Sequence, residues 1–260
     1  MEQRSSAVDH LVVIARTLTE GVAWCEAALG VTPGPGGEHP LFGTHNRLLN
    51  VASDAFPGVY FEIIAINSVA NYHANKPAKR WFDMDSPLLQ ASLAAHGPQL
   101  AHWVARVPDV HHTASDWRLL GLERGAPKAA SRQTPHGLLQ WQITVREDGQ
   151  RLMDGCLPTL IEWGADPQQP GAAAQPIGQA IVHPTDHMPA SGLHLQALHL
   201  RHPQAPLLSQ ALAAAGLPSP VDAPLQVMQG LPQLEAQLLT PKGVVHLRSV
   251  PRSTEESSHV

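Results

Sequence analysis

Two histidines and two glutamates recur at matching places along the chain, and all four carry side chains that bind metals. His10 lies in one apolar run and Glu62 in a later one, and the pair His102 and Glu162 repeats that order further on. Imidazole nitrogens and carboxylate oxygens, with open positions for water or substrate, are the donors of a divalent metal in catalytic sites. The four residues therefore predict one metal site, suited to zinc, nickel, cobalt, manganese or iron(II).

The surroundings of Glu62 support this interpretation, although a single histidine would not. Glu62 stands between Phe61 and Ile63, where a lone buried carboxylate is costly and a bound cation would offset the cost. The chain has 16 histidines, so any one of them is more often structural than a ligand. The hypothesis depends on the repeated order of an early His and a late Glu.

The elements that must position these residues form two copies of one unit. Apolar runs predict strands, and helical spacing of apolar residues predicts one helix in each copy. The first copy has a strand, a helix and two strands at residues 8–14, 17–29, 46–51 and 58–66. The second copy has the same order at residues 100–107, 108–122, 137–145 and 155–163. Internal repetition of this kind indicates a duplicated fold.

A third, partial unit follows and lacks the ligand pair. Its strands and its helix, closed by Gly216, repeat the order, but no Glu stands in its last strand, residues 244–249. We expect an α+β fold in which paired βαβββ modules form a cup-shaped mixed sheet, with a third partial βαββ unit at the C-terminus. The expected divisions are a first module at 7–67, a linker at 68–98, a second module at 99–165, a connector at 166–190, a degenerate third module at 191–250 and a disordered tail at 251–260.

The composition of the chain argues against nucleic-acid binding and against a membrane span. The net charge of −5 and the pI near 6.3 do not provide the basic face that nucleic-acid binding needs, so no nucleic-acid partner is expected. No apolar run is long enough to span a membrane, and Cys25 and Cys156 form no disulfide framework, so a cytoplasmic protein is expected. The dinucleotide, P-loop and nucleophile-elbow motifs are absent from the sequence.

Several segments resemble the glyoxalase-like domain families of the vicinal-oxygen-chelate superfamily. The resemblance covers about residues 8–165 and is carried by DHLVVIARTL, HPLFGTHNRLL, YFEIIAI, RWFDMDSP and GPQLAHWVARV. It implies paired βαβββ modules that curl into a cup. It also implies a metal in the cup, held by first-strand histidines and last-strand glutamates, which here are His10, His102, Glu62 and Glu162. The superfamily includes isomerases, epimerases, dioxygenases, lyases, thiol transferases and metal-free members.

Four further residues are candidates for substrate binding, each with a structural alternative. Asn46 and Arg47 follow a Gly-rich loop and could bind a carboxylate or carbonyl, or simply begin a strand. Arg106 shares the face of His102 and could hold a substrate or reach the rim of the cup. Trp103 could line the pocket, although core packing is the commoner role of a buried tryptophan.

These observations predict a metal-dependent lyase or isomerase that acts on a small substrate with adjacent oxygens. The metal would serve as a Lewis acid, and a glutamate, Glu162 or Glu62, as the general base. The alternatives are a metal-free protein that sequesters a small molecule and an extradiol-type dioxygenase. Because both modules lie in one chain, a monomer is sufficient, and a homodimer is equally compatible.

Overall fold

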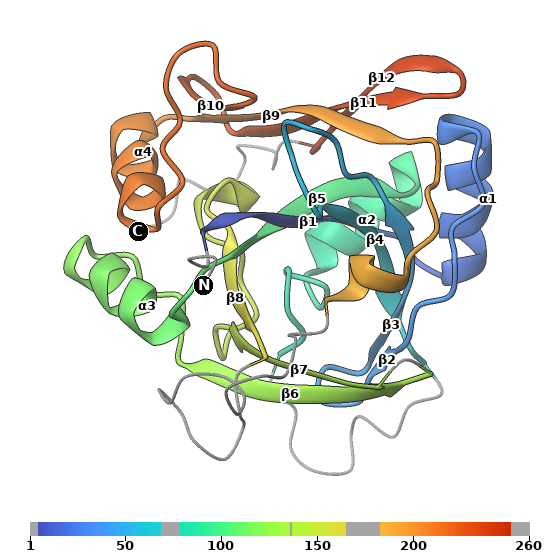
Figure 1. Cartoon of the computed structure of the whole chain (residues 1–260), viewed down its shortest axis with the longest axis horizontal. Coiled ribbons are helices and arrows are strands. Elements are labelled where there is room, and N and C mark those ends of the chain that lie inside the picture. Colours follow the sequence, from blue (N-terminus) through green and yellow to red (C-terminus); the bar gives the residue numbers. More distant parts are fainter. Residues whose placement is uncertain (1–4, 69–78, 136, 165–182, 251–260) are drawn as a thin grey trace.

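The computed structural model describes residues 5–68, 79–135, 137–164 and 183–250, and its largest element is one curved sheet (Figure 1). The predicted α+β class is confirmed. The sheet has eight strands in the order β2-β3-β4-β1-β5-β8-β7-β6. The expected disordered tail, 251–260, lies outside the described residues, as does most of the expected connector, 166–190.

The first βαβββ module forms one half of this sheet. Its elements are β1 (Ala7–Ile14), α1 (Leu18–Leu29), β2 (Glu38–His39), β3 (Thr44–Asn50) and β4 (Tyr60–Ile66). Thr17 caps α1 by accepting a hydrogen bond from the backbone N of Glu20, and Gly30 ends the helix with φ of 79°. β1 pairs in parallel with β4, so the first and last strands of the module lie side by side.

The second module repeats the arrangement in the other half. Its elements are β5 (Gln99–Arg106), α3 (Val110–Leu119), β6 (Pro127–Thr134), β7 (Gly137–Thr144) and β8 (Thr159–Trp163). β5 pairs in parallel with β8 and antiparallel with β1, which joins the halves about a pseudo-two-fold axis. β6 was not expected from the sequence, because its residues are mostly polar and no side chain along it is fully buried. β8 begins later than the expected residue 155, after a 3-10 turn at Met153–Gly155.

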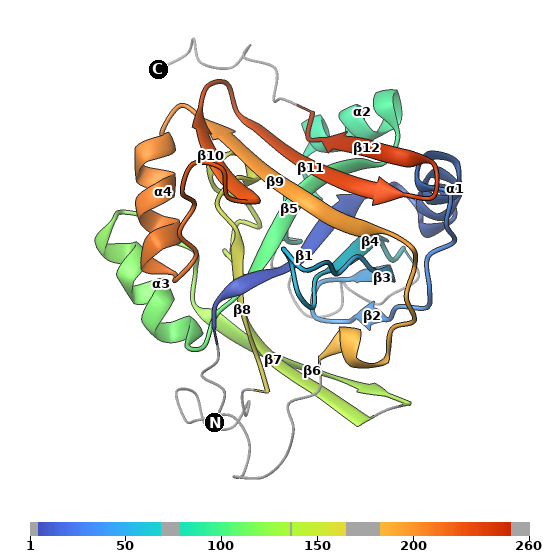
Figure 2. The same cartoon turned by 45° about the horizontal axis from the view of Figure 1, so that its top comes forward.

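The third unit forms a separate four-stranded sheet over the back of the large one (Figure 2). It comprises β9 (His194–His202), α4 (Ala205–Ala214), β10 (Leu225–Gln229), β11 (Gln233–Thr240) and β12 (Gly243–Arg248). It has three strands after its helix, one more than a βαββ unit contains. Its strand order, β10-β9-β11-β12, also differs from the modules, because β9 lies next to the first strand after the helix.

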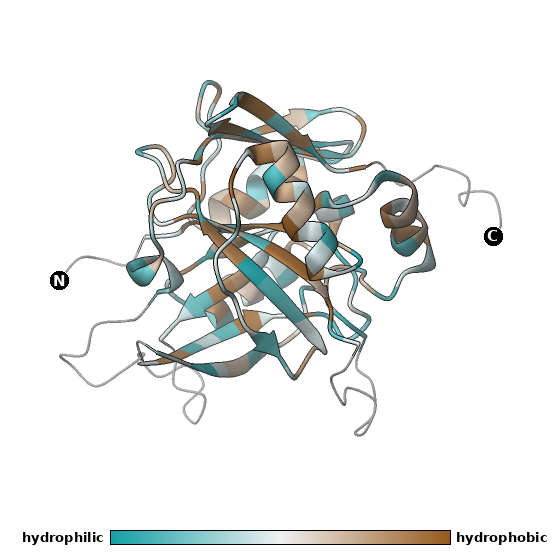
Figure 3. Cartoon of the chain, turned by 90° about the vertical axis from the view of Figure 1, so that its right-hand side faces the viewer, coloured by the Kyte–Doolittle hydropathy of each residue, from teal (hydrophilic) through white to brown (hydrophobic). Residues whose placement is uncertain are grey.

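The main hydrophobic core lies between the two sheets. It combines the back faces of β1, β4 and β5 with α1, α3, α4 and the inner face of the third unit. Figure 3 shows hydrophobic stretches along strands of both sheets. The hydrogen bonds that fasten the third unit include those from Trp117 Nε1 to Ala211 O at 2.7 Å and from Lys242 Nζ to Ala27 O at 2.6 Å. The lysine therefore neutralises the carbonyl end of α1.

A second, smaller core fills much of the cup itself. The segment before α2 (Pro87–His96), part of the expected linker, inserts Trp81, Phe82 and Met84 among side chains of both modules. Trp81 stacks on Phe42 with ring centroids 4.0 Å apart and on Phe82 at 5.0 Å. Beside the inserted segment, a small cavity remains in the cup, lined by side chains of both modules. The described residues include no helix with the length and apolar character needed to span a bilayer.

Candidate active site

A β-bulge in β1 turns two consecutive polar residues into the cup. Val8 pairs with Ala105 and His10 with Val104, so Asp9 is the extra residue of the bulge. Strand alternation would otherwise send Asp9 and His10 to opposite faces. Beyond the bulge the alternation resumes, with Leu11 in the core between the sheets. The bulge therefore gives His10 an adjacent carboxylate as a partner.

Asp9 is fully buried and accepts three hydrogen bonds. His10 Nδ1 donates to Oδ1 at 2.7 Å, while Trp163 Nε1 and His183 Nε2 donate to Oδ2 at 2.9 Å and 3.1 Å. Burial by itself raises the pKa of this carboxyl, but the bonds and the charges of the two histidines outweigh it and lower the pKa well below its usual value. Asp9 is therefore ionised, and it fixes the Nδ1–H tautomer of His10.

His10 then presents Nε2 to Glu62. The nitrogen lies 3.6 Å from Glu62 Oε2, and both side chains are about 6% exposed. The imidazole stacks on Tyr60, with ring centroids 4.5 Å apart and planes at 21°. Tyr60 and Asp9 hold the ring of His10 in place, and its Nε2 faces Glu62.

Asn46 and His39 complete the surroundings of Glu62. Asn46 Nδ2 donates to Glu62 Oε1 at 2.6 Å, and Asn46 Oδ1 accepts from the Gly37 backbone N at 2.7 Å. His39 Nε2 lies 4.0 Å from Glu62 Oε1. Burial lowers the pKa of His39 to about 4, against an opposing effect of Glu62, so His39 is neutral at neutral pH. Glu62 is thus a buried side chain bonded by the Asn46 amide and flanked by two imidazole rings.

Arg132, on β6, supplies positive charge at the edge of this group. Its charge contributes to lowering the pKa of His39. A Cβ on Gly37 would collide with the guanidinium, and a Cβ on Gly36 would collide with Asn46. The two glycines therefore let both side chains approach the loop. We call the group His10, His39, Asn46, Glu62 and Arg132 the polar pocket.

The polar pocket opens toward a larger hollow. The pocket encloses a cavity of about 40 Å³, enough for one or two water molecules or a small reactive group. An adjoining cleft of about 650 Å³, the outer cleft, lies between the loop at residues 31–36 and residues 183–191. The two share four lining residues: Leu48, Arg132, Leu139 and Pro184. Arg132 therefore stands where a ligand in the outer cleft would enter the pocket.

His102, a predicted metal ligand, faces the cup but has both ring nitrogens engaged. Nδ1 donates to Gly155 O at 3.1 Å, and Nε2 accepts from the Thr159 backbone N at 3.1 Å. Burial, followed by the charges of Arg124 and Arg151, lowers the pKa of this histidine well below its usual value. His102 is therefore a neutral, internally bonded residue in the structure.

Glu162, the other predicted ligand of the second module, lies on the opposite face of β8. Its Oε2 accepts a hydrogen bond from the Val110 backbone N at 3.1 Å, at the start of α3. Ile161 and Trp163 take the positions that face the cup. The carboxylate therefore stabilises a helix N-terminus and does not reach the polar pocket.

The residue equivalent to Glu62 in the second module is Thr159. Glu62 pairs with Val12 across the parallel strands, two residues after His10, and Thr159 pairs with Val104, two residues after His102. His102 Nε2 lies 3.0 Å from Thr159 Oγ1, as His10 Nε2 lies beside Glu62. The structure therefore brings together His10 and Glu62 of the four predicted ligands, and the second pair has a hydroxyl where the first has a carboxylate.

Of the four predicted substrate-binding residues, one lies in the polar pocket and three lie outside it. Only Asn46 lines the polar pocket. Arg47 is exposed, and Arg106 donates from Nη2 to Pro57 O at 2.8 Å, outside the pocket. Trp103 is fully buried between the sheets, where Nε1 donates to Cys156 O at 2.9 Å. For Trp103 the alternation of side chains along β5 decides the outcome, because its immediate neighbours His102 and Val104 face the cup and Trp103 faces the core between the sheets.

The sequence interpretation missed Asp9, His39, Arg132 and His183. Asp9 was invisible because a bulge reverses its face, and Arg132 because β6 carries no apolar pattern. His39 had a usable signal, since it stands in the same Gly-rich segment as Asn46. His183 had none, because it reaches Asp9 from a segment distant in sequence.

The donors in the polar pocket fit a divalent ion only in part. His10 offers Nε2 and Glu62 a carboxylate oxygen, and a carboxylate holds the other nitrogen of His10, as is usual for metal-binding histidines. Within the described ranges, no group of three or more His, Cys, Asp or Glu side chains has a spacing that would hold a metal ion. The two side chains thus supply two donors, and His102 and Glu162 do not complete the set.

If His10 binds a metal, replacing Asp9 with Asn should reduce the metal affinity of the pocket about 10- to 100-fold. The amide can no longer accept from His10, Trp163 and His183 together, so the orientation and tautomer of His10 are lost. Isothermal titration with the metal, or the exchange assay described below, measures the effect. Asp186→Asn serves as the control. It replaces an exposed carboxylate in a 3-10 helix that accepts a hydrogen bond from the His183 backbone N. Equal losses in both variants would contradict a role in orienting His10.

Stability should fall as the pH drops below about 6.5, with His102 contributing up to about 1.4 kcal/mol per pH unit. The pKa of His102 is lowered in the folded state, so at mildly acidic pH this imidazole binds a proton in the unfolded chain and not in the folded one. The contribution of His102 to stability is complete above the pKa that this residue has in the unfolded chain, and it is lost as the pH falls below that value. Urea denaturation at pH 7, 6 and 5 should show a shallower slope in His102→Gln. The exposed His96, changed to Gln, should leave the slope unaltered.

Comparison with known proteins relates the chain to one family. A family model described as a glyoxalase-like domain matches residues 8–216. No curated protein sequence matches the chain. The matched range runs from β1 through α4, so it includes both modules and the start of the third unit.

Solved structures are similar to the chain at low identity. A hypothetical protein from Staphylococcus aureus is 11% identical, with a TM-score of 0.49, over 94% of this chain and 85% of that one. A Streptomyces coelicolor methylmalonyl-CoA epimerase variant in complex with 2-nitronate-propionyl-CoA is 14% identical, with a TM-score of 0.36, over 61% and 98%. A methylmalonyl-CoA epimerase from Mycobacterium tuberculosis is 14% identical, with a TM-score of 0.34, over 60% and 86%.

Proposed function

We propose that this chain, which belongs to the glyoxalase-like domain family, is an enzyme. The enzyme would move a proton at a carbon next to a carbonyl group. The observation that carries the proposal is the buried Glu62 carboxylate, held by Asn46 at 2.6 Å and facing the Asp9-oriented His10 at 3.6 Å. A positioned carboxylate in a water-poor pocket is suited to general base catalysis. The reaction class is isomerase or lyase chemistry.

The roles of the side chains follow from their contacts. Glu62 accepts the proton, while Asn46 fixes the direction of its free oxygen. Arg132 binds an anionic group of the substrate at the junction of the polar pocket and the outer cleft. The small cavity takes the reacting carbon and its adjacent oxygens, and the outer cleft takes the remainder of the molecule. The substrate class is therefore an anionic compound with neighbouring oxygens and a larger substituent.

A divalent ion is the cofactor that this family's chemistry favours. His10 and Glu62 would hold it, and it would supply Lewis acidity to a substrate carbonyl. The remaining positions would fall to water and substrate oxygens.

Hydrogen–deuterium exchange in D2O tests the proposal directly. The purified protein is incubated with 2-hydroxy acids, 2-oxo acids, α-hydroxycarbonyl compounds and acyl thioesters, with and without each candidate metal, and carbon-bound protons are followed by NMR. Loss of a substrate proton next to a carbonyl, dependent on the protein, is the expected result. Binding without exchange across the whole panel would overturn the proposal.

Metal content distinguishes the roles of the two glutamates. Near one equivalent of a bound divalent metal is expected in the native protein, reduced in His10→Ala and Glu62→Ala and retained in Glu162→Ala. Glu162→Ala is a matched control because that carboxylate bonds the α3 backbone. Loss of metal in Glu162→Ala alone would show that the metal lies elsewhere.

The aromatic walls of the pocket favour a second candidate, a metal-free binding protein. Trp81, Trp141 and Trp163 line the pocket, and the rings of Trp141 and Trp163 lie 5.6 Å apart. Such walls hold planar ligands by stacking. Tight binding that survives Glu62→Gln, with no exchange, would favour this candidate. Oxygen uptake with a catechol and iron(II) would instead favour a dioxygenase.

A further inference from the structure

Arg124 is a buried guanidinium without a carboxylate partner among the described residues. Its side chain is about 3% exposed, and its one hydrogen bond runs from Nη2 to Thr159 Oγ1. Nε and Nη1 are buried with no partner in the described part of the chain. Most buried donors in proteins are satisfied, so two unsatisfied donors on one charged group require an explanation.

The neighbouring cations have carboxylates of their own. Arg124 lines a cavity of about 10 Å³ together with Arg146 and Arg151. Arg146 pairs with Asp148, and Arg151 pairs with Asp83 at 2.8 Å. The cavity therefore carries one positive charge that the described side chains do not balance.

The charge on Arg124 persists at neutral pH. Burial, and then the nearby Arg146, lower the pKa of its guanidinium to about 9. A buried cation without a counter-charge is strongly unfavourable. A water molecule could accept a hydrogen bond from the guanidinium but would leave its charge unbalanced, whereas an anion would accept the bond and balance the charge.

The size of the cavity limits the occupant. About 10 Å³ holds a single water-sized particle, so sulfate, phosphate and organic acids are too large. Trp81 lines the same cavity, and its Nε1 is also buried without a hydrogen-bond partner among the described residues. Indole and guanidinium N–H groups are donors only, which matches an occupant that accepts from every side.

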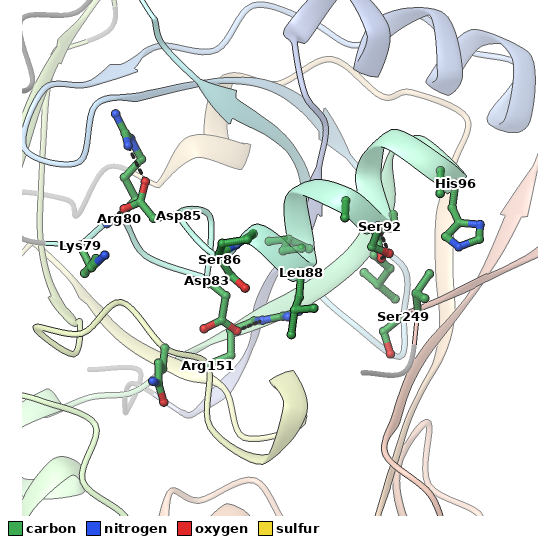
Figure 4. Close-up of a pocket in the computed structure, with 18 of the residues that line it drawn as sticks. Lys79, Arg80, Asp83, Asp85, Ser86, Leu88, Ser92, His96, Arg151 and Ser249 are labelled. Atoms are coloured by element: carbon green, nitrogen blue, oxygen red, sulfur yellow. Dashed lines mark hydrogen bonds and ion pairs between the residues drawn. The ribbon is translucent and has the colours of Figure 1, made fainter. Parts of the chain in front are cut away.

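A path to the cavity leads from a larger hollow beside α2. That hollow, of about 610 Å³, shares Gln150 and Arg151 with the small cavity. Figure 4 shows Arg151 reaching Asp83 beside Leu88, at the boundary of the hollow. Movement of this one ion pair would connect Arg124 with solvent.

We propose that the cavity at Arg124 binds one chloride ion, held by an N–H group of the guanidinium that has no partner in the described part of the chain. The ion occupies the half of the cup in which Thr159 stands in place of Glu62, and Arg124 bonds that threonine. The second module thus holds an anion against a buried cation where the first holds a carboxylate beside a histidine. This site is independent of the proposed enzyme activity.

The test compares chloride and bromide with gluconate at constant ionic strength and neutral pH. For the wild-type protein, a saturable rise of about 2 to 5 °C in the unfolding midpoint is expected as halide replaces gluconate. Arg124→Gln should lose the response, because its side chain carries no charge. Arg106→Gln, which removes a guanidinium bonded to Pro57 outside the cavity, should keep it.

A crystal grown with bromide provides a readout that needs no variant. An anomalous peak in the cavity beside the Arg124 guanidinium, together with the saturable thermal response, would support the site. Water at that position, or equal midpoints in halide and gluconate, would overturn it. A peak without any thermal response at millimolar halide would mean an adventitious ion only and would also overturn it.

Discussion

Exchange of the substrate's carbon-bound proton with solvent should fall by a factor of about 10² to 10⁴ when Glu62 is replaced by Gln. The amide keeps the size of the side chain and can still accept the 2.6 Å hydrogen bond from Asn46 Nδ2. It cannot accept a proton at neutral pH. Because packing is preserved, the loss should appear in kcat more than in substrate affinity. The measurement is the exchange rate in D2O at saturating substrate.

The matched control for this variant is Glu162→Gln. Glu162 is buried to a similar extent, with about 8% exposed against 4% for Glu62, but it bonds the backbone at α3. Its replacement should lower stability while leaving the exchange rate within a few-fold of the wild type. An unchanged rate in Glu62→Gln, or a large loss in Glu162→Gln alone, would reverse the roles given to the two carboxylates.

The main strands of the first module could be predicted from the sequence because they are apolar runs, although the bulge at Asp9 breaks the alternation just before His10. His10 and Glu62 lie on two of these strands, and the structure sets their side chains 3.6 Å apart. Glu162 was matched to Glu62 because each stands near the end of an apolar run. The strand pairing instead makes Thr159 the equivalent of Glu62. Glu162 lies three residues later, an odd number, and therefore on the opposite face of β8.

Features that depend on the tertiary structure could not be predicted. The bulge at Asp9 exists only in the pairing of β1 with β5, and a single strand read in isolation contains no sign of it. β6 is an edge strand of polar residues, so Arg132 had no pattern to mark it. Trp81 and Phe82 were expected to pack somewhere, but only the closed sheet shows that they fill half of the cup.

Replacing Trp103 with Ala should lower the free energy of unfolding by about 3–5 kcal/mol. Trp103 is among the largest fully buried side chains, in the core between the large sheet and the third unit. Its removal leaves a cavity there and also strands the Cys156 carbonyl, which accepts the indole N–H at 2.9 Å. Urea denaturation followed by circular dichroism measures the loss. Trp103→Phe should lose less, because most of the apolar area remains.

The same variant separates a structural role from a substrate-binding one. Trp24→Ala, on the half-buried face of α1, is the control and should cost clearly less, because the site can fill with water. At a temperature where Trp103→Ala remains folded, substrate affinity should match the wild type, since Trp103 lies behind the sheet. A large change in affinity with little loss of stability would place Trp103 in the pocket. The expected outcome instead makes the third unit part of the support for β5, and through β5 for the strand that carries His10.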